Sequence, residues 1–366
     1  MLHILHAADL HLDAPFTGLS PDQARQRRSE QRDLLERLAD LARERRADLV
    51  LLAGDLFDSG DTYAETTQVL ARALGRTGCP VCIAPGNHDF CGARSPYRVL
   101  SWPDNVHIFS RPTLEPLELP DLTCTVWGAA FSAPAREDSP LSGFTAPADG
   151  RVHLGVLHGE VDGKGRYSPL PREEIAASGL TYLALGHVHA CSGLQWAGRT
   201  AWAYPGCPEG RGFDELGEKG CLWVTIGDEG QVEAEFVPLA RRRYRVVEVD
   251  LTGAETPEAA LAAALPADAR EDILRFVLTG ESGLEGIDLP PLEALAAGCC
   301  WSAQVRDRTR VRRDLWDRAE EDTLTGLFLR NMRARLSAAG PEERETLELA
   351  VRFGLAALEH GEDCRP

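Results

Sequence analysis

Five apolar runs that each lead into a histidine- or aspartate-containing cluster constrain the fold of this chain more than any other feature. The runs read as β-strands over residues 3–8, 48–53, 80–84, 152–161 and 182–189. Each of the polar clusters ends such a strand. Because α/β sheets place their ligands at the carboxyl ends of strands, we expect the clusters to meet in one site.

The clusters supply carboxylate, carboxamide and imidazole groups but no thiolate. They are Asp9-x-His11, Gly54-Asp55, Gly86-Asn87-His88-Asp89, His158-Gly159-Glu160 and Gly186-His187-x-His189. This donor set is typical of Mn²⁺, Fe²⁺, Mg²⁺ or Zn²⁺ and is too rich in nitrogen for Ca²⁺. Eight or so ligands exceed the needs of one ion, so we expect two, about 3.5–4 Å apart and bridged by a carboxylate. The neighbouring glycines let the backbone turn tightly beside the metals.

His187 and His189 lie two residues apart at the end of the expected strand 182–189. Residues i and i+2 of a strand point to the same face. If the strand continues to His189, the two imidazoles therefore share one side of the sheet.

The order of elements favours two packed sheets with helices outside. A helix is expected over 21–46, where leucines recur at spacings of three to four residues, and a second over 66–74, closed by Gly75. Further strands are expected over 106–110, 123–131, 200–204, 220–226 and 232–239. Gly198-Arg199 reads as a hairpin turn between 195–197 and 200–203.

The remaining sequence suggests two smaller parts. Strands over 246–251, 273–279 and 302–307 alternate with helices over 257–264 and 290–297, which predicts a small α+β domain. Two amphipathic helices follow, separated at Gly340-Pro341. They either pack on a core of their own or form a partner-binding pair. The expected boundaries are 1–240, 241–310 and 311–366.

Composition restricts the environment of the protein. A net charge of −18 argues against a protein that coats nucleic acid nonspecifically. No apolar run reaches about 18 residues and no signal peptide is visible, so we expect a cytoplasmic protein without a membrane span. The ten cysteines are then reduced. Cys79 and Cys82 lie within an apolar strand, which favours buried thiols over a redox or metal pair.

The arginine-rich stretch 241–245 leaves two interpretations open. Arg241, Arg243 and Tyr244 are candidates for a nucleic-acid contact, with the tyrosine ring as a stacking surface. The stretch is equally well explained as a solvated junction between domains, balanced by nearby acids.

The ordered motifs D-x-H, G-D, G-N-H-D, H-G and G-H-x-H resemble those of the calcineurin-like metallophosphoesterases. Further features resemble the DNA-repair exonuclease branch, the SbcD-like and YhaO-like nucleases: Ala8-Asp9-Leu-His11, Gly54-Asp55-Leu-Phe-Asp58, Tyr204-Pro-Gly206 and Glu218-Lys-Gly220. The resemblance covers residues 1–240. It implies a four-layer αββα sandwich, to which the chain adds a small α+β cap domain and a C-terminal helical tail.

The resemblance also implies residue roles. One ion would be held by Asp9, His11 and His189, and the other by Asn87, His158 and His187. Asp55 would bridge them, so that His187 and His189 serve different ions. His88 would face the scissile phosphate and protonate the leaving oxygen, with Asp89 orienting it.

The leading hypothesis is a two-metal phosphodiesterase that cleaves DNA in repair, a Mn²⁺-dependent exonuclease or endonuclease. The cap, 241–310, would shape the DNA groove. Family resemblance adds an SMC/ABC-type coiled-coil ATPase and a homodimer as expected partners. Two alternatives stay open. One is a metallophosphoesterase acting on a small nucleotide or phosphodiester, and the other is a non-catalytic scaffold for an ATPase.

Overall fold

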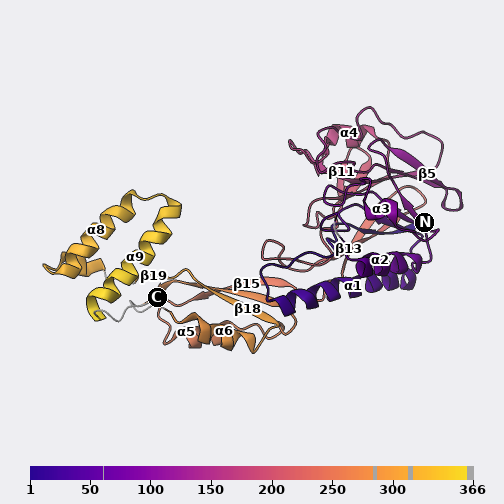
Figure 1. Ribbon diagram of the computed structural model, residues 1–366. Coiled ribbons are helices and arrows are strands. Elements are labelled where there is room, and N and C mark those ends of the chain that lie inside the picture. Colours follow the sequence, from indigo (N-terminus) through magenta and orange to yellow (C-terminus); the bar gives the residue numbers. More distant parts are fainter. Residues whose placement is uncertain (61, 283–286, 312–315, 361–366) are drawn as a thin grey trace. The chain divides into compact units, whose positions relative to one another are not determined.

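The computed structural model describes residues 1–60, 62–282, 287–311 and 316–360 (Figure 1). The chain divides into two compact units, Met1–Arg243 and Tyr244–Pro366. None of the helices in the described part has both the length and the apolar character needed to cross a membrane.

The first unit contains a six-stranded sheet in the order β14-β13-β1-β2-β3-β4. Its strands are β1 (Leu2–Ala7), β2 (Leu49–Leu52), β3 (Val81–Ile83), β4 (Val106–Ile108), β13 (Gly220–Ile226) and β14 (Val232–Pro238). Strands β1 to β4 are parallel, and the crossovers β1–β2 and β2–β3 run through α1 (Pro21–Glu44) and α2 (Ala64–Gly75). A capping box between Ser20 and Gln23 begins α1.

A second six-stranded sheet has the order β11-β12-β10-β7-β6-β5. Its strands are β5 (Glu115–Leu119), β6 (Cys124–Gly128), β7 (Val152–His158), β10 (Tyr182–Gly186), β11 (Gln195–Ala197) and β12 (Thr200–Ala203). The hairpin expected at Gly198 is confirmed, with a positive φ of 58° at that glycine. Smaller elements are α3 (Pro96–Val99), α4 (Arg172–Ala177), β8 (Glu160–Val161), β9 (Pro169–Leu170) and the 3₁₀ turn Pro120–Leu122.

Alternate side chains of each strand divide between two cores. On β1 and β2, Ile4 and Leu51 face the second sheet and pack with Val156, whereas Leu5 and Val50 face the helices α1 and α2. On the other side of the second sheet, Ile175 of α4 lies in a third cluster. Burying each such aliphatic side chain contributes about 1.5–3 kcal/mol. The expected four-layer sandwich, with two sheets inside and helices outside, is confirmed.

The backbones of the two sheets touch where the metal-motif strands end. A Cβ added to Gly186, the last residue of β10, would lie 1.9 Å from the carbonyl oxygen of Ala53, which follows β2. Only glycine permits this approach. The loops after β1, β2, β3, β7 and β10 therefore emerge close together.

The second unit begins with a three-stranded parallel sheet of order β15-β16-β18, formed by Tyr244–Asp250, Ile273–Thr279 and Ser302–Asp307. The crossover helices α5 (Pro257–Ala264) and α6 (Leu289–Ala297) cover one face through Leu261 and Leu292. Two short strands, β17 (Glu281–Ser282) and β19 (Arg310–Val311), pair beyond its carboxyl end.

The tail forms a helical hairpin of α8 (Leu324–Ala338) and α9 (Pro341–His360), preceded by the 3₁₀ turn Arg318–Glu320. Met332 and Leu336 of α8 pack with Leu347 and Val351 of α9, so these helices do build a core of their own. A second set of apolar side chains on the same helices is exposed: Leu324, Leu327, Leu349, Phe353 and Leu358.

Candidate metal centre

The five predicted clusters converge at one edge of the sandwich, on loops with an uncommon backbone conformation. Asp9, His11, Asp55 and His187 all have positive φ angles, of 53°, 43°, 50° and 110°. Non-glycine residues rarely adopt such angles, and they gather at functional sites, where the surrounding structure imposes them. Here the buried loops force the side chains toward a shared space.

Asp9, His11 and His189 form one group whose ligand atoms all lie within 4.8 Å of one another. The Nε2 atoms of His11 and His189 are 3.2 Å apart. Each ring has its Nδ1 atom beside a carboxylate, so the two Nε2 lone pairs face the same point. Two nitrogens in this arrangement suit a shared cation.

His158, Asn87 and His187 form the other group. His158 places Nε2 3.0 Å from the side-chain oxygen of Asn87, while its Nδ1 lies 2.9 Å from the carbonyl oxygen of Ala53. The His187 ring stands edge-on to that of His158, with centroids 5.3 Å apart. The structure thus brings all seven predicted ligands together.

Asp55 lies between the two groups. One carboxylate oxygen is 3.3 Å from Nε2 of His158 and 3.8 Å from Nε2 of His11. The other oxygen accepts a hydrogen bond from the backbone N–H of His88. This central position is the one that a bridging ligand needs.

Burial and mutual charge shift the pKa values of these groups strongly. Burial lowers the pKa of His11 and of His187 to about 4, so both rings are neutral near pH 7. Burial also raises the pKa of Asp9 to about 6. At His158, burial is outweighed by the carboxylates of Asp55 and Asp9, which raise its pKa to about 9.

These shifts indicate that the centre lacks positive charge. Two buried carboxylates, Asp9 and Asp55, are balanced within the described residues chiefly by a proton on His158. Divalent cations would replace that proton and leave the histidines neutral, as metal ligation requires. The donor set, its burial and its uncompensated charge therefore fit two divalent ions.

A carboxylate–arginine network outside the ligands holds two of the histidines. Asp58 lies 3.1 Å from Nδ1 of His11, and Glu215 lies 2.7 Å from Nδ1 of His189. Arg211 donates to both carboxylates, at 2.9 Å each. Neither Glu215 nor Arg211 was predicted from the sequence. Their spacing of four residues in the loop after Tyr204-Pro-Gly206 was the only available signal.

The motifs Tyr204-Pro-Gly206 and Glu218-Lys-Gly220 also contact the loops that carry the candidate ligands. The hydroxyl of Tyr204 donates to the carbonyl of Gly159 and accepts from the N–H of Val161, which fixes the turn after His158. Lys219 donates to the carbonyl oxygen of His189 at 3.1 Å. These residues therefore support the ligands without occupying the site.

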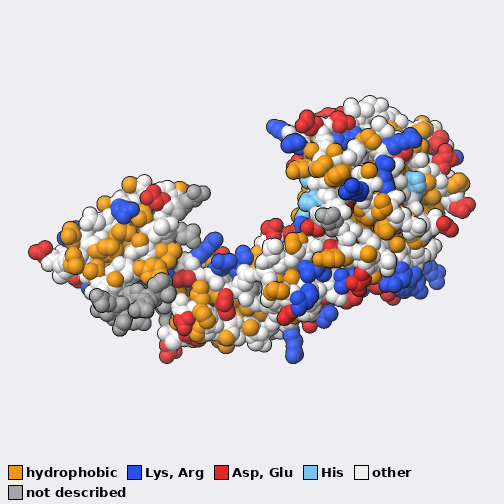
Figure 2. Space-filling model, viewed as in Figure 1, with side chains coloured by type: hydrophobic (Ala, Val, Ile, Leu, Met, Phe, Trp, Pro, Cys, Tyr) orange, Lys and Arg blue, Asp and Glu red, His pale blue; other side chains and the backbone are white. Residues whose placement is uncertain are grey.

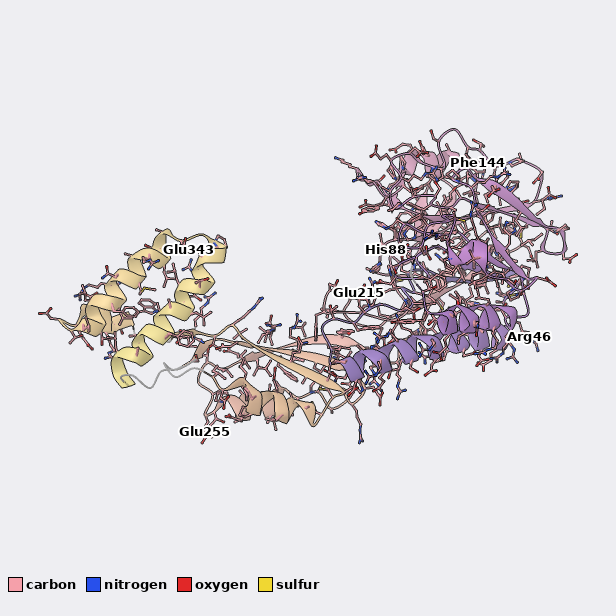
Figure 3. All side chains as sticks on the ribbon, in the orientation of Figure 1. Arg46, His88, Phe144, Glu215, Glu255 and Glu343 are labelled. Carbon is pink, nitrogen blue, oxygen red and sulfur yellow. The ribbon has the colours of Figure 1, made fainter. Side chains whose placement is uncertain are left out.

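His88 and Asp89 have different surroundings. His88 is exposed, and its Nδ1 lies 3.0 Å from the carbonyl oxygen of Asp58, so Nε2 is available to a bound molecule. In Figure 3, His88 and Glu215 lie on the same side of the unit. Asp89 does not orient His88 as predicted. Its buried carboxylate accepts from the N–H groups of Leu56, Phe57 and Gly86 and from the Tyr97 hydroxyl, and so ties two ligand loops together.

The shared strand face predicted for His187 and His189 is wrong. β10 ends at Gly186, and the N–H of His187 turns to donate to both carboxylate oxygens of Asp9, at 3.0 and 3.1 Å. The alternation of side chains stops there. His187 consequently stands beside His158, and His189 beside His11.

The predicted stacking surface at Tyr244 is also wrong, because this residue is only 3% exposed. Arg242 is buried as well and donates to the Glu30 carboxylate through Nε and Nη2. Arg241 and Arg243 retain partial exposure. The stretch 241–245 is therefore in part a buried structural element.

Cys79 and Cys82 are buried free thiols, as expected. Burial raises the pKa of Cys79 to about 11, which keeps the thiol protonated and unreactive near neutral pH.

Comparisons with known proteins identify the family of this chain. The model of the calcineurin-like phosphoesterase family matches residues 2–191. The uncharacterized metallophosphoesterase YhaO of Bacillus subtilis is 32% identical over 69% of this chain and 64% of its own length. A component of the nuclease SbcCD of the same organism is 28% identical over 63% of this chain and 67% of its own. The DNA double-strand break repair protein Mre11 of Aeropyrum pernix is 30% identical over 69% of this chain and 64% of its own.

The matched region thus spans about two thirds of the length of these relatives. The family model covers more than half of the chain, including all five ligand clusters. The chain belongs to the calcineurin-like phosphoesterase family.

Proposed function

We propose that this protein hydrolyses DNA phosphodiester bonds with the help of two divalent ions, Mn²⁺ being the expected metal. The observation that carries the proposal is the clustering of possible metal-binding groups, Asp9 with His11 and His189 and Asp9 with Asp55 and His158, beside the exposed His88. Relatives whose names describe a nuclease component and a double-strand break repair protein favour DNA as the substrate.

The residues of the candidate site would have two roles, metal binding and proton donation. Bound ions at Asp9, His11 and His189 and at Asn87, His158 and His187, with Asp55 shared, would supply an activated water and neutralise phosphate charge. His88 would donate a proton from Nε2 to the leaving oxygen. The carbonyl of Asp58 holds the ring for this role through Nδ1.

An aromatic side chain stands at the entrance to the site. The ring of Tyr167 is 42% exposed and lies 5.1 Å from that of His187, centroid to centroid. An exposed ring beside a phosphodiesterase centre can stack on a nucleobase. The cap domain, expected over 241–310, would shape the groove for the rest of the DNA.

The test compares substrates for the same purified protein. Mn²⁺-loaded protein should release nucleotides from linear or hairpin DNA and lose this activity on His88→Ala substitution. An Asp55→Asn variant purified in parallel controls for contaminating nucleases. Hydrolysis of a small aryl phosphodiester together with no action on any DNA end, hairpin or single strand would refute the DNA assignment.

A small phosphodiester or nucleotide is the alternative substrate. The observation in its favour is the net charge of −18, which opposes the approach of a long polyanion. In that case the aryl ester and cyclic nucleotides would be cleaved with higher kcat/KM than any DNA.

A coiled-coil ATPase remains a proposed partner. The exposed apolar side chains of α8 and α9, among them Leu327 and Phe353, offer a surface that a partner helix could cover. Co-purification with an SMC/ABC-type ATPase, lost on Leu327→Ser with Phe353→Ser, would support it. Sedimentation of the protein alone would test the proposed homodimer.

A further inference from the structure

A hollow of about 830 Å³ lies within the second unit, far along the chain from the metal ligands. It is bounded on one side by the carboxyl end of the β15-β16-β18 sheet and on the other by α8 and α9. The residues that line it include Glu281, Arg308, Arg310, Trp316, Arg333 and Arg344. This volume is in the range of small-molecule sites in proteins.

The position of the hollow is one that α/β units commonly use for ligands. The strands β15, β16 and β18 are parallel, and Thr279 and Gly280 stand where β16 ends. Gly280 has a φ of 82°, and a Cβ added there would lie 1.9 Å from the Asp250 carboxylate, so only glycine permits the backbone turn at this end of the hollow. Ligands of open parallel sheets bind outside the carboxyl ends of the strands.

A buried polar network joins the two walls of the hollow. Arg352 of α9 donates to Asp307 at 2.6 Å, to Ser282 at 3.1 Å and to the hydroxyl of Thr309. These partners are buried or half-buried, and hydrogen bonds to charged groups are stronger than those between neutral groups. The helix hairpin is thereby attached to the sheet, so the hollow is preformed.

Four arginines line the hollow, in a protein that is acidic as a whole. Arg308 and Arg310 form no ion pair with any residue in the described ranges. Arg333 and Arg344 contact Glu320 and Glu348, but these pairs are largely exposed and contribute little. Figure 2 shows basic side chains gathered over the end of the sheet beside the tail helices.

The arginine surplus is the unusual property of this hollow. Glu281 and Glu348 of the lining, together with Glu320 beside Arg333, leave the four arginines with a surplus of positive charge among the described residues. Guanidinium groups bind phosphate oxygens in pairs of parallel hydrogen bonds. An opposite wall of Trp316, Leu336 and Val351 is apolar and includes an aromatic ring.

We propose that this hollow binds a nucleotide, with its di- or triphosphate on Arg308 and Arg310 and its base against Trp316. A hollow between a sheet end and a helix pair fits a compact anion better than a continuous duplex. The hollow and the metal centre share no residue, and the proposal does not depend on what that centre hydrolyses.

The test measures binding of ATP and of inorganic tripolyphosphate to the full chain by calorimetry. EDTA is present, so that nucleotide cannot bind through ions at the metal centre. We expect saturable binding of ATP and at least a tenfold loss of affinity in an Arg308→Gln, Arg310→Gln double variant. Arg335→Gln is the matched control, because Arg335 is exposed on α8 outside the hollow and should leave the affinity unchanged. Equal thermal unfolding midpoints of the variants establish that they fold.

A Trp316→Ala variant distinguishes the contribution of the base to binding from that of the phosphates. It should weaken ATP binding and leave tripolyphosphate binding unchanged. The absence of saturable ATP binding to the wild-type protein, or equal ATP affinity in the double variant, would overturn the proposal. So would a dependence on Arg308 and Arg310 that appears for single-stranded DNA and not for ATP. Equal weakening of both ligands by Trp316→Ala would overturn the assignment of the base.

Discussion

Glu215 holds His189 from outside the metal centre, with its carboxylate oxygen Oε1 2.7 Å from the imidazole Nδ1. The same oxygen accepts from Arg211, whose other terminal nitrogen reaches Asp58, the partner of His11. Two ligands of one proposed ion are therefore oriented by a single network. A carboxylate on Nδ1 keeps the proton there and leaves Nε2 free to bind metal.

Removal of Glu215 should weaken one metal ion. We expect Glu215→Ala to lower Mn²⁺ affinity about 10- to 100-fold at the position that Asp9, His11 and His189 would form, with Glu215→Gln intermediate. The reason is that the imidazole loses its orientation and its basicity. A Mn²⁺ titration followed by electron paramagnetic resonance would resolve the two ions. Glu218→Ala is the matched control, since Glu218 is exposed in the same loop; comparable losses in both variants would contradict a specific role for Glu215.

Substitution of His88 should affect turnover without affecting metal binding. His88 is exposed, and its ring is held through Nδ1 by the backbone of Asp58. Loss of a general acid typically lowers the rate about 10²- to 10⁴-fold. We expect this for His88→Asn on DNA, whose leaving group is an alkoxide.

The same variant should lose much less activity on an aryl phosphodiester. A phenolate leaves without needing a proton, so the general acid contributes little. Steady-state kinetics on both substrates with one Mn²⁺-loaded preparation would measure the difference. Equal losses on the two substrates would point to a role in binding phosphate, and not in proton transfer.

The convergence of the candidate metal ligands could be predicted from sequence because each of them sits in a short motif at the end of a recognisable strand. The network behind them could not. Glu215 meets His189 across 26 residues, and no local pattern distinguishes it from Glu218. The end of β10 was missed for a related reason. Apolar Val188 continues the strand pattern, but the N–H of His187 bonds to Asp9, a contact of separation 178.

The sequence also could not predict which of the residues 241–245 are buried. Five residues, 241–245, contain four arginines, and nothing in the sequence separates the buried Arg242 from its partly exposed neighbours. The deciding partner, Glu30, lies 212 residues away on α1. Arg242 can be buried because this acid, distant in the sequence, compensates its charge.

The Glu30 carboxylate should be a large contributor to stability. It is nearly fully buried and accepts from Arg242 at 2.6 Å and from Arg27 at 2.9 Å. Removing one partner of a buried ion pair leaves a charge without compensation and costs about 3–5 kcal/mol. We expect a loss of this size for Glu30→Ala in urea unfolding. Glu235→Ala, which breaks the exposed pair with Arg45, should cost no more than about 1 kcal/mol; a similar effect of both changes would contradict the argument.

His6 should make the fold sensitive to mild acid. Its ring is fully buried on β1, with Nδ1 2.8 Å from the Tyr182 hydroxyl and Nε2 3.2 Å from the carbonyl oxygen of Leu185. Burial lowers its pKa from 6.5 to about 3, and the bond to Leu185 opposes this only in part. Between these values the unfolded chain binds a proton that the folded chain does not. The free energy of unfolding therefore falls as the pH drops below 6.5, by up to about 1.4 kcal/mol per pH unit.

A His6→Gln variant removes this titration while keeping a polar group beside Tyr182. Urea unfolding with EDTA, at pH 7 and at pH 5, would measure the free energy of unfolding of both proteins without bound metal. We expect the wild-type protein to lose about 2 kcal/mol more than the variant between the two pH values. Other acid-sensitive groups are common to both proteins, so they cancel in this comparison. An identical loss in wild type and variant would mean that His6 is protonated in the fold, and that its burial does not exclude the charge.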